Sequence, residues 1–115
     1  MILRFSVPGL VPSNNKVTRH VGGKPLKSVA AREYQARVQS IAKAEALAQG
    51  WRTGGPVAVS IIAFGTRLDV DNIAKNVLDG MAGAVYENDS SVYLLFVKKM
   101  PSPGGHKWIE VEVEA

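Results

Sequence analysis

The sequence predicts a single layered α/β domain of the α+β type, in which a mixed β-sheet packs against two main helices. Short segments rich in apolar or β-branched residues, which are typical of strands, alternate along the chain with two longer segments whose apolar residues recur at helical spacing. The chain has 115 residues, the usual size of one domain, and shows no internal repeat and no linker-like stretch. We therefore predict one domain that spans residues 1–115.

The N-terminal part is expected to hold one strand and one long loop. Residues 2–7 alternate between polar and apolar side chains, as in a half-buried strand whose inner face carries Leu3, Phe5 and Val7. Residues 8–27 are rich in Pro, Gly, Asn and cations and predict a loop without regular structure. A loop of this length in a small domain is usually functional or disordered.

The next segment predicts a long amphipathic helix over residues 29–49. Ser28 is a suitable N-cap for this helix, and Gly50 is a good C-terminal stop. Five residues at helical spacing form the stripe that we expect to be buried: Tyr34, Val38, Ile41, Ala44 and Ala48.

The C-terminal half predicts a strand, a second helix and two further strands. Residues 57–65 are apolar on both faces, so we expect them to form a central strand. A helix over 71–86 follows, then an acidic turn, an apolar strand over 92–100 and an alternating strand over 106–114. We expect the buried stripe of this helix to be formed by Ile73, Val77, Met81 and Ala84. The opposite, polar stripe is formed by Asn72, Lys75, Asn76 and Asp79.

Composition limits the class of protein. The formal net charge of +4 suits a polyanionic partner such as nucleic acid, although many basic proteins bind none. The absence of cysteine excludes disulfides, thiolate zinc sites and thiol catalysis within this chain. No apolar run approaches the ~20 residues that cross a bilayer, and we see no secretory leader. We therefore expect a cytoplasmic protein with no membrane partner.

Two carboxylates stand close together in RLDVDN, residues 67–72, where the buried strand gives way to the second helix. Asp69 and Asp71 repel each other unless a cation lies between them. In extended chain their side chains point to the same side, an arrangement that suits a hard cation such as Mg²⁺. The alternative is that Asp71 caps the helix and Asp69 is solvated. An EF-hand loop is excluded, because Ala74 and Gly80 stand where glycine and glutamate are required.

Two further residues favour the metal interpretation. Lys75 lies one helical turn after Asp71, where its ammonium group can approach the carboxylates and a bound phosphate; the alternative is an ordinary ion pair at i, i+4. Asp89 lies in the acidic turn after the same helix, although aspartate is also a common turn residue.

These motifs resemble those of the RusA-type Holliday junction resolvases, small metal-dependent endonucleases of bacteria and their phages. The first motif is DVDNIAKNVLDGM, which an acidic turn and an apolar strand follow. The second is PSNNKVTRH, residues 12–20, directly after the first strand. The resemblance covers nearly the whole chain, including its length and element order, and implies a RusA-like fold.

The resemblance also implies roles for individual residues. The paired catalytic aspartates of the family fall on Asp69 and Asp71, its active-site lysine on Lys75, and its third essential aspartate on Asp89. Some members carry two adjacent acids in that turn, whereas Asn88 precedes Asp89 here, so Glu87 is a substitute candidate. Members can also carry several arginines before the aspartates, and this chain has Arg67 alone.

What the resemblance implies about activity is specific. We expect a structure-specific endodeoxyribonuclease that resolves four-way junctions by paired phosphodiester hydrolysis in DNA recombination and repair. Asp69, Asp71 and Asp89 would hold one or two Mg²⁺ ions, or Mn²⁺, and no small-molecule cofactor is expected. Two matched cuts require two active sites, so we expect a homodimer, acting in the cytoplasm of a bacterial or phage-infected cell. The alternatives are a junction-binding protein that does not cut, or a nuclease that prefers other branched DNA.

The long loop and Arg67 are the expected DNA contacts, because cations and side-chain amides supply most contacts to phosphates. The loop candidates are Asn14, Asn15, Lys16, Arg19 and His20, with Lys24 and Lys27 as additional cations. The two asparagines could instead form the turn that carries the cations. The two tryptophans, Trp51 and Trp108, could stack on bases, but we expect them to be buried in the core or an interface.

The route by which Asp89 reaches the paired aspartates is open at this point. The second helix spans roughly 20 Å, so the chain must reverse after it. Residues 90–97 could run beside residues 57–65, with the acidic turn near the C-terminal end of that strand. Alternatively, Asp89 joins the site from the dimer partner.

Overall fold

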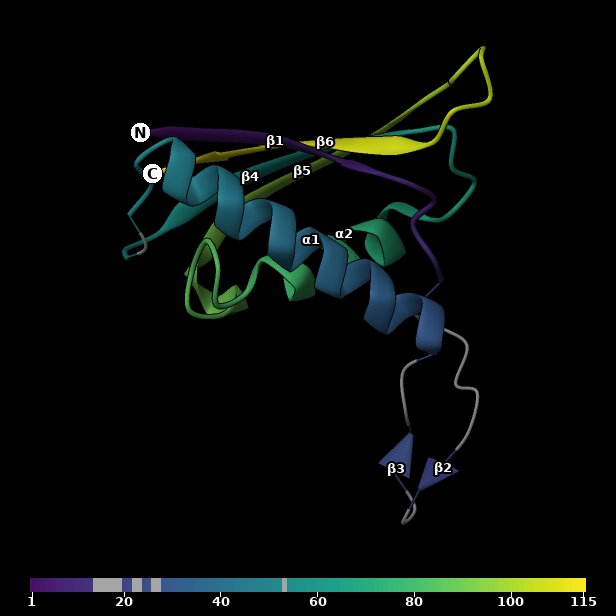
Figure 1. The fold of residues 1–115 in the computed structure, drawn as a ribbon, viewed down its shortest axis with the longest axis horizontal. Helices are drawn as coiled ribbons and strands as arrows, with labels where there is room; N and C mark the ends of the chain where they lie inside the picture. The colour runs from purple at the N-terminus through teal and green to yellow at the C-terminus, as the bar shows by residue number, and fades with distance from the viewer. Residues whose placement is uncertain (14–19, 22–23, 26–27, 53) are drawn as a thin grey trace.

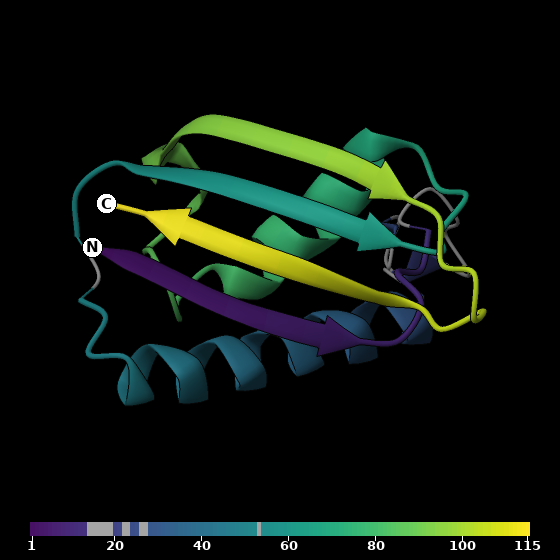
Figure 2. The ribbon, with the colours of Figure 1, turned by 90° about the horizontal axis from the view of Figure 1, so that it is seen from above.

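The structure is a computed structural model that describes the chain except residues 14–19, 22–23, 26–27 and 53. A mixed four-stranded sheet has the order β1-β6-β4-β5, and both helices, α1 and α2, pack on one of its faces (Figures 1 and 2). The predicted fold class, a layered α+β arrangement with a mixed sheet and two main helices, is confirmed.

The first and the last strands of the chain pair with each other. Strand β1, Ile2–Pro8, runs antiparallel to β6, Trp108–Glu114. Both strands alternate between buried and more exposed positions, as predicted, so that Leu3, Phe5 and Val7 face the helices. Their apolar faces therefore supply part of the core.

Strand β4, Val57–Phe64, is central, as its apolar composition predicts. It pairs antiparallel with β6 on one side and parallel with β5, Val92–Met100, on the other. A parallel pair requires a crossover connection, and the segment that contains α2 provides it. Strand β5 is consequently an edge strand of the sheet.

Helix α1, Val29–Ala48, has the predicted ends. The Ser28 hydroxyl accepts a hydrogen bond from the Ala31 amide at 3.1 Å, and Gly50 follows the helix with φ +69°. The buried stripe differs from the prediction near its end, where Ala42 and Ala46 are buried while Ala44 and Ala48 are exposed. The sequence did not reveal this shift, because alanine occurs at all four positions.

Helix α2, Val70–Met81, is shorter than predicted. The segment after it leaves the helical region at Ala82, whose ψ is 131°, and Gly83 adopts φ +85°, a value that favours glycine. Ala82 then bridges to Tyr86. The prediction of helix through residue 86 is therefore wrong, because glycine at position 83 ends the regular backbone.

The two helices pack closely where α2 has a glycine. A Cβ atom added to Gly80 would lie 2.7 Å from the Val38 Cβ, so the absence of a side chain allows the close approach. Neither helix in the described part of the chain is long and apolar enough to span a bilayer.

The predicted loop over 8–27 contains two short strands. Strands β2, His20–Val21, and β3, Lys24–Pro25, pair antiparallel and lie apart from the main sheet (Figure 1). The expectation of a loop without regular structure is therefore wrong for these four residues.

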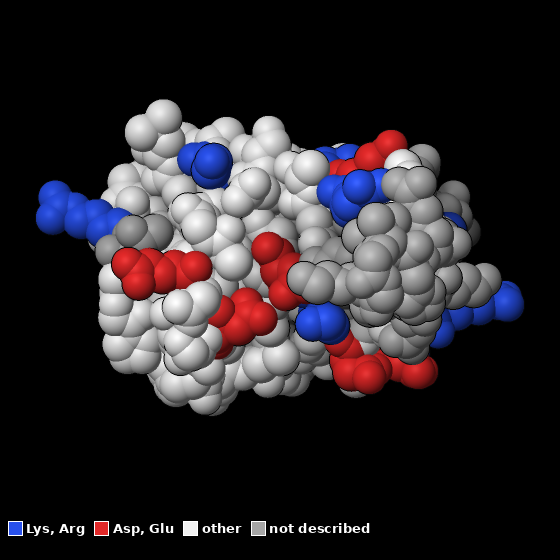
Figure 3. Space-filling model, turned by 90° about the horizontal axis from the view of Figure 1, so that it is seen from below, with Lys and Arg blue, Asp and Glu red and all other residues white. Residues whose placement is uncertain are grey.

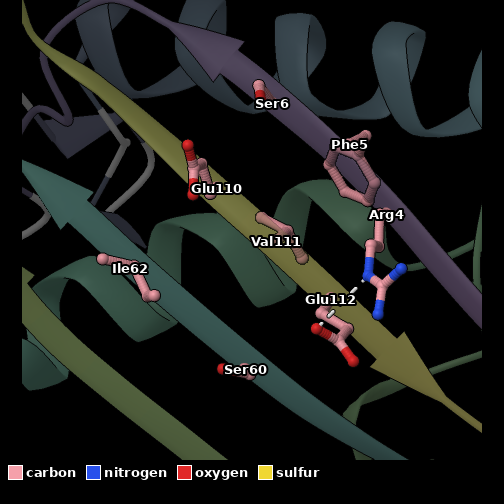
Figure 4. Close-up of a pocket in the computed structure, with 8 residues that line it drawn as sticks. All are labelled: Arg4, Phe5, Ser6, Ser60, Ile62, Glu110, Val111 and Glu112. Carbon is pink, nitrogen blue, oxygen red and sulfur yellow. Dashed lines mark ion pairs between the residues drawn. The ribbon is translucent and has the colours of Figure 1, made fainter.

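The face of the sheet opposite the helices is uncovered in the described part of the chain. A hollow on this face is lined by side chains of β1, β4 and β6, and Arg4 pairs with Glu112 across it at 3.5 Å (Figure 4). Glu110, Glu112 and Glu114 of β6 also lie on this face.

Candidate active site at the start of α2

The paired aspartates lie at the N-terminus of α2. Asp69 is the N-cap with an extended backbone, but its carboxylate accepts no capping hydrogen bond from the helix. Asp71 lies within the first helical turn, and both residues are exposed. The alternative in which Asp71 is the cap is therefore wrong, and so is the assumption that the two residues share an extended segment. Both carboxylates nevertheless stand at one helix end, where the helix dipole favours negative charge.

A hollow opens directly before this helix, between the end of β4 and the segment after β1. It is lined by Pro12, Ser13, Arg67 and Lys107 together with neighbouring apolar residues. Lys107 comes from the connection between β5 and β6, and its ammonium group donates a hydrogen bond to the Gly65 carbonyl at 3.1 Å. Lys107 could not be identified from the sequence, since a lone lysine in a turn gives no signal of what the fold brings near it.

Lys75 follows Asp71 by one helical turn and is largely exposed. The ion pair that it makes among the described residues is to Asp79, one turn further along, at 3.8 Å. Asp71, Lys75 and Asp79 therefore form a row along α2 with alternating charge. The sequence placed Asp79 on this polar stripe without assigning it a role.

Asp89 lies at the other end of α2 from the paired aspartates. It begins the short 3₁₀ helix Asp89–Ser91, which leads directly into β5. Because β5 is parallel to β4, with Val57 opposite Val92, the acidic turn lies at the N-terminal end of β4. The route that placed this turn near the C-terminal end of that strand is therefore wrong. Helix α2 is about 18 Å long at 1.5 Å per residue. Within one chain, this helix separates Asp89 from Asp69.

Asp89 instead shares a second hollow with Asp79. The other side chains that line it are those of Gln35, Ala82, Asn88 and Ser90. Burial raises the pKa of the neighbouring Tyr86 phenol, and the Asp89 and Asp79 carboxylates raise it further. Both carboxylates therefore lie near Tyr86, at the C-terminal end of α2. Glu87, the substitute candidate, is exposed in the same turn.

Two asparagines of the predicted polar stripe are buried. Asn76 is fully buried, and its amide donates to the Pro12 carbonyl at 2.7 Å while its oxygen accepts from Gln35 at 3.1 Å. Asn72 is also buried, and its carbonyl accepts from the Asn76 amide at 3.2 Å. The exposed face of α2 is thus narrower than predicted, and Asn76 connects the helix to the start of the long loop.

Among the DNA-contact candidates, Arg67 is exposed beside Asp69. Asn14, Asn15, Lys16, Arg19 and Lys27 lie outside the described residues, and His20 and Lys24 are described as backbone of β2 and β3.

Both tryptophans have structural partners. Trp51 is buried and donates to the Val85 carbonyl at 3.0 Å, which confirms the core prediction. Trp108 is partly buried and stacks on Phe64 with ring centroids 4.2 Å apart.

Charge on the helix-covered side is mixed. Several acidic patches lie near its middle, with basic side chains around them (Figure 3). Among the residues that the structure describes, no group of three or more His, Cys, Asp or Glu side chains is arranged to hold a metal ion. The described part of one chain therefore offers a pair of carboxylates at the start of α2 and a separate pair at its end.

The comparisons with known proteins agree with this arrangement of motifs. The family model described as endodeoxyribonuclease RusA matches residues 8–114. A search of curated proteins finds no match to the chain. The family match covers both motifs, the whole sheet after residue 7 and both helices. On this evidence the chain belongs to the RusA endodeoxyribonuclease family, the family of Holliday junction-resolving endonucleases.

Proposed function

We propose that this protein is a Mg²⁺-dependent, structure-specific endodeoxyribonuclease that resolves four-way junctions by paired cuts during DNA recombination and repair. The observation that carries the proposal is that the Asp69 carboxylate is exposed and makes no capping hydrogen bond. An N-cap aspartate ordinarily uses its carboxylate to accept a backbone amide hydrogen. The Asp69 carboxylate accepts no such bond and is exposed next to Asp71, so it is available as a ligand.

The residues present fit a hard divalent cation. Mg²⁺ favours oxygen ligands and commonly binds one or two carboxylates, with water and substrate phosphate as its other ligands. Asp69 and Asp71 provide that minimum, and Mn²⁺ accepts the same donors. When bound, such an ion supplies Lewis-acid chemistry, because it polarises a phosphate and makes water more acidic.

The basic residues around the site account for binding of the DNA backbone. Arg67 and Lys107 line the hollow before α2, where they neutralise phosphate charge. Lys75 carries an exposed ammonium group one turn into the helix, and it stabilises negative charge that develops on a phosphate next to the aspartates. The ion pair with Asp79 draws that group one turn away from Asp71, so the exposed side chain must swing back along the helix to contact a phosphate at the aspartates.

A single chain does not complete this site with Asp89. That residue lies at the far end of α2, so we propose that it reaches the paired aspartates of a second copy in a homodimer. A two-fold dimer has two such composite sites. Two equivalent sites match the two opposite strands of a four-way junction that must be cut.

The test is an assay with purified protein and labelled DNA. A four-way junction, a flap and a linear duplex are incubated with Mg²⁺, with Mn²⁺ and with EDTA. Cleavage of the junction at two symmetric positions with either metal, and none with EDTA, supports the proposal. A gel shift without product in any condition indicates a binding protein instead, and preferred cleavage of the flap indicates a different branched substrate.

A further inference from the structure

We infer that the hollow before α2 holds one unpaired nucleotide of the branched DNA, next to the phosphate that is cut. This inference rests on the proposed function for the substrate, and it adds how a branch is distinguished from an intact duplex. A base that is stacked and paired inside a duplex cannot enter a hollow, whereas a base that is already unpaired leaves its stack at a lower cost.

The first observation is where the hollow lies. Strands β1 and β4 end, and β6 begins, at the same end of the sheet, since Trp108 pairs with both Pro8 and Phe64 (Figure 2). Three segments that are distant in the sequence line the hollow there: residues 10–13, residues 65–68 and Lys107. The second of these segments leads directly into Asp69, so the hollow adjoins the start of the helix with the paired carboxylates.

The second observation is the size and the lining of the hollow. Its volume of about 420 Å³ falls within the ~300–1,000 Å³ of pockets that hold small ligands. The apolar part of its lining contains buried Val11, half-buried Pro12 and Leu68, and Leu10, which is 54% exposed. The faces of a base are apolar and pack against such side chains. A hydrated metal ion or a free phosphate would gain nothing from them.

The third observation is the pair of cations on the same hollow. Arg67 and Lys107 both line it, and both are exposed. Among the residues that the structure describes, neither of them forms an ion pair with a carboxylate. Two cations beside apolar walls suit a nucleotide, because the cations bind its phosphates while the walls cover its base. An apolar peptide segment in the same place would leave both charges without a partner.

The fourth observation is that hydrogen bonds hold the lining segments together. The Lys107 ammonium group donates to the Gly65 carbonyl at 3.1 Å, and the Lys107 carbonyl accepts from the Gly9 amide at 2.8 Å. The Thr66 hydroxyl accepts from the Leu68 amide at 3.1 Å, which fixes the turn just before α2. A hollow with walls that are already ordered binds its ligand with a smaller loss of entropy.

These features give the hollow a role in the choice of substrate. Asp69 and Asp71 act on the phosphate, and the hollow decides which DNA brings a phosphate to them. A branched DNA that places an unpaired nucleotide there presents the adjoining phosphate at the start of α2. A linear duplex must first unstack and unpair a base, so it is bound more weakly at this position and cut more slowly.

Fluorescence of 2-aminopurine tests the inference without cleavage. Four-way junctions carry this base at single positions on either side of the crossover, and linear duplexes of the same sequence carry it at the matching positions. Each DNA is titrated with the protein in EDTA. Because stacking quenches 2-aminopurine, its emission should rise about twofold or more at one junction position and stay unchanged in the duplex. A protein that binds the junction without a change at any position overturns the inference.

A charged substitution in the hollow locates the base. Leu10→Glu places a carboxylate among the apolar walls and should abolish the rise in emission. Leu47→Glu is the matched control, because it changes a leucine of α1 that is 86% exposed, and it should keep the rise. Circular dichroism checks that both variants are folded. A rise that survives Leu10→Glu would show that the base is extruded elsewhere, which overturns the inference.

The phosphate contact is tested by Lys107→Gln. This change removes the charge but keeps a donor for the Gly65 carbonyl, so it separates DNA binding from support of the turn. It should lower the slope of log affinity against log salt by about 0.9, the value for one phosphate contact. Lys43→Gln, which changes an exposed lysine of α1, should leave the slope unaltered. An unaltered slope for Lys107→Gln would reject the cationic side of the site.

The outcomes distinguish this inference from the proposed function. A protein that cuts junctions without a rise in emission keeps the proposed function and loses the hollow as its nucleotide site. A protein that shows the rise, loses it in Leu10→Glu and cuts no DNA with Mg²⁺ rejects the nuclease and keeps the hollow. A protein that binds no junction overturns both.

Discussion

The side-chain amide of Asn76 in α2 donates a hydrogen bond to the backbone carbonyl of Pro12, 2.7 Å away. This bond joins the helix that carries Asp71 and Lys75 to the segment that leads into the loop with the predicted DNA contacts. Gln35 of α1 completes the contact by donating to the Asn76 oxygen. Asn76 is fully buried, so its polar groups depend on these partners.

We expect Asn76→Ala to lower both stability and DNA affinity. Loss of the buried amide leaves the Pro12 carbonyl without its partner, which should cost about 1–3 kcal/mol of unfolding free energy. Urea denaturation measures that loss, and binding of a labelled junction measures affinity. Gln39→Ala is the matched control, since Gln39 donates to the Ala82 carbonyl at the C-terminal end of α2. It should affect stability alone; equal affinities for wild type and Asn76→Ala would show that the anchor does not position the loop.

Asp69→Asn and Asp71→Asn should each abolish junction cleavage while binding is kept or strengthened. Removing a carboxylate destroys a cation ligand and at the same time reduces repulsion of the phosphates. Cleavage rates with Mg²⁺ and gel shifts with EDTA test the two effects separately. A wild-type rate from either variant would contradict the metal site.

The composite site predicts complementation between inactive subunits. Asp89→Asn should reduce cleavage as severely as Asp71→Asn, whereas Glu87→Gln should have little effect. Mixed dimers of Asp71→Asn and Asp89→Asn subunits contain one complete site and should nick the junction. Mixing Asp69→Asn with Asp71→Asn is the control, because no site is complete in that dimer. If the first mixture stays inactive although the subunits exchange, Asp89 does not act across the dimer.

The loop contacts predict a change in salt dependence. Lys16→Ala combined with Arg19→Ala should weaken junction binding and flatten the plot of log affinity against log salt. Each phosphate contact that is lost lowers the slope by about 0.9. Titrations at several salt concentrations measure the slope, and Arg32→Ala, an exposed cation on α1, serves as the control. An unchanged slope would place the DNA on another basic surface.

Tyr34 predicts a loss of stability at alkaline pH. Its hydroxyl is buried and has no hydrogen-bond partner among the described residues, and burial raises the pKa of the phenol well above 10. The unfolded chain therefore releases this proton near pH 10 while the folded chain retains it, so stability falls as pH rises above 10. Tyr34→Phe should be at least as stable as wild type at pH 7 and should lose less stability by pH 11. Thermal unfolding at both pH values measures this, and a larger loss in the variant would contradict it.

Much of the fold could be predicted because local sequence patterns indicate the type and the ends of each helix or strand. The alternation of Leu3, Phe5 and Val7 indicated a strand with one buried face, and the fully apolar run at 57–65 indicated a central strand. Ser28 and Gly50 marked the ends of α1 through their own hydrogen bonding and backbone freedom. The sequence also determined which side chains can serve as ligands, since Asp69, Asp71 and Lys75 stand within two turns of one helix start.

Only the tertiary structure decided where those groups lie relative to the rest of the chain. The apolar sequence of residues 92–100 predicts a strand but not its direction relative to β4. The parallel pairing with β4 places Asp89 at the far end of α2. Burial of Asn76 likewise depends on Pro12, which is 64 residues away along the chain. Sequence patterns report periods of two or 3.6 residues within one element, whereas strand direction and long-range hydrogen bonds depend on how separate elements pack. For this reason the sequence alone identified the chemical groups of the site, and the arrangement of the sheet decided that one chain does not bring all of them together.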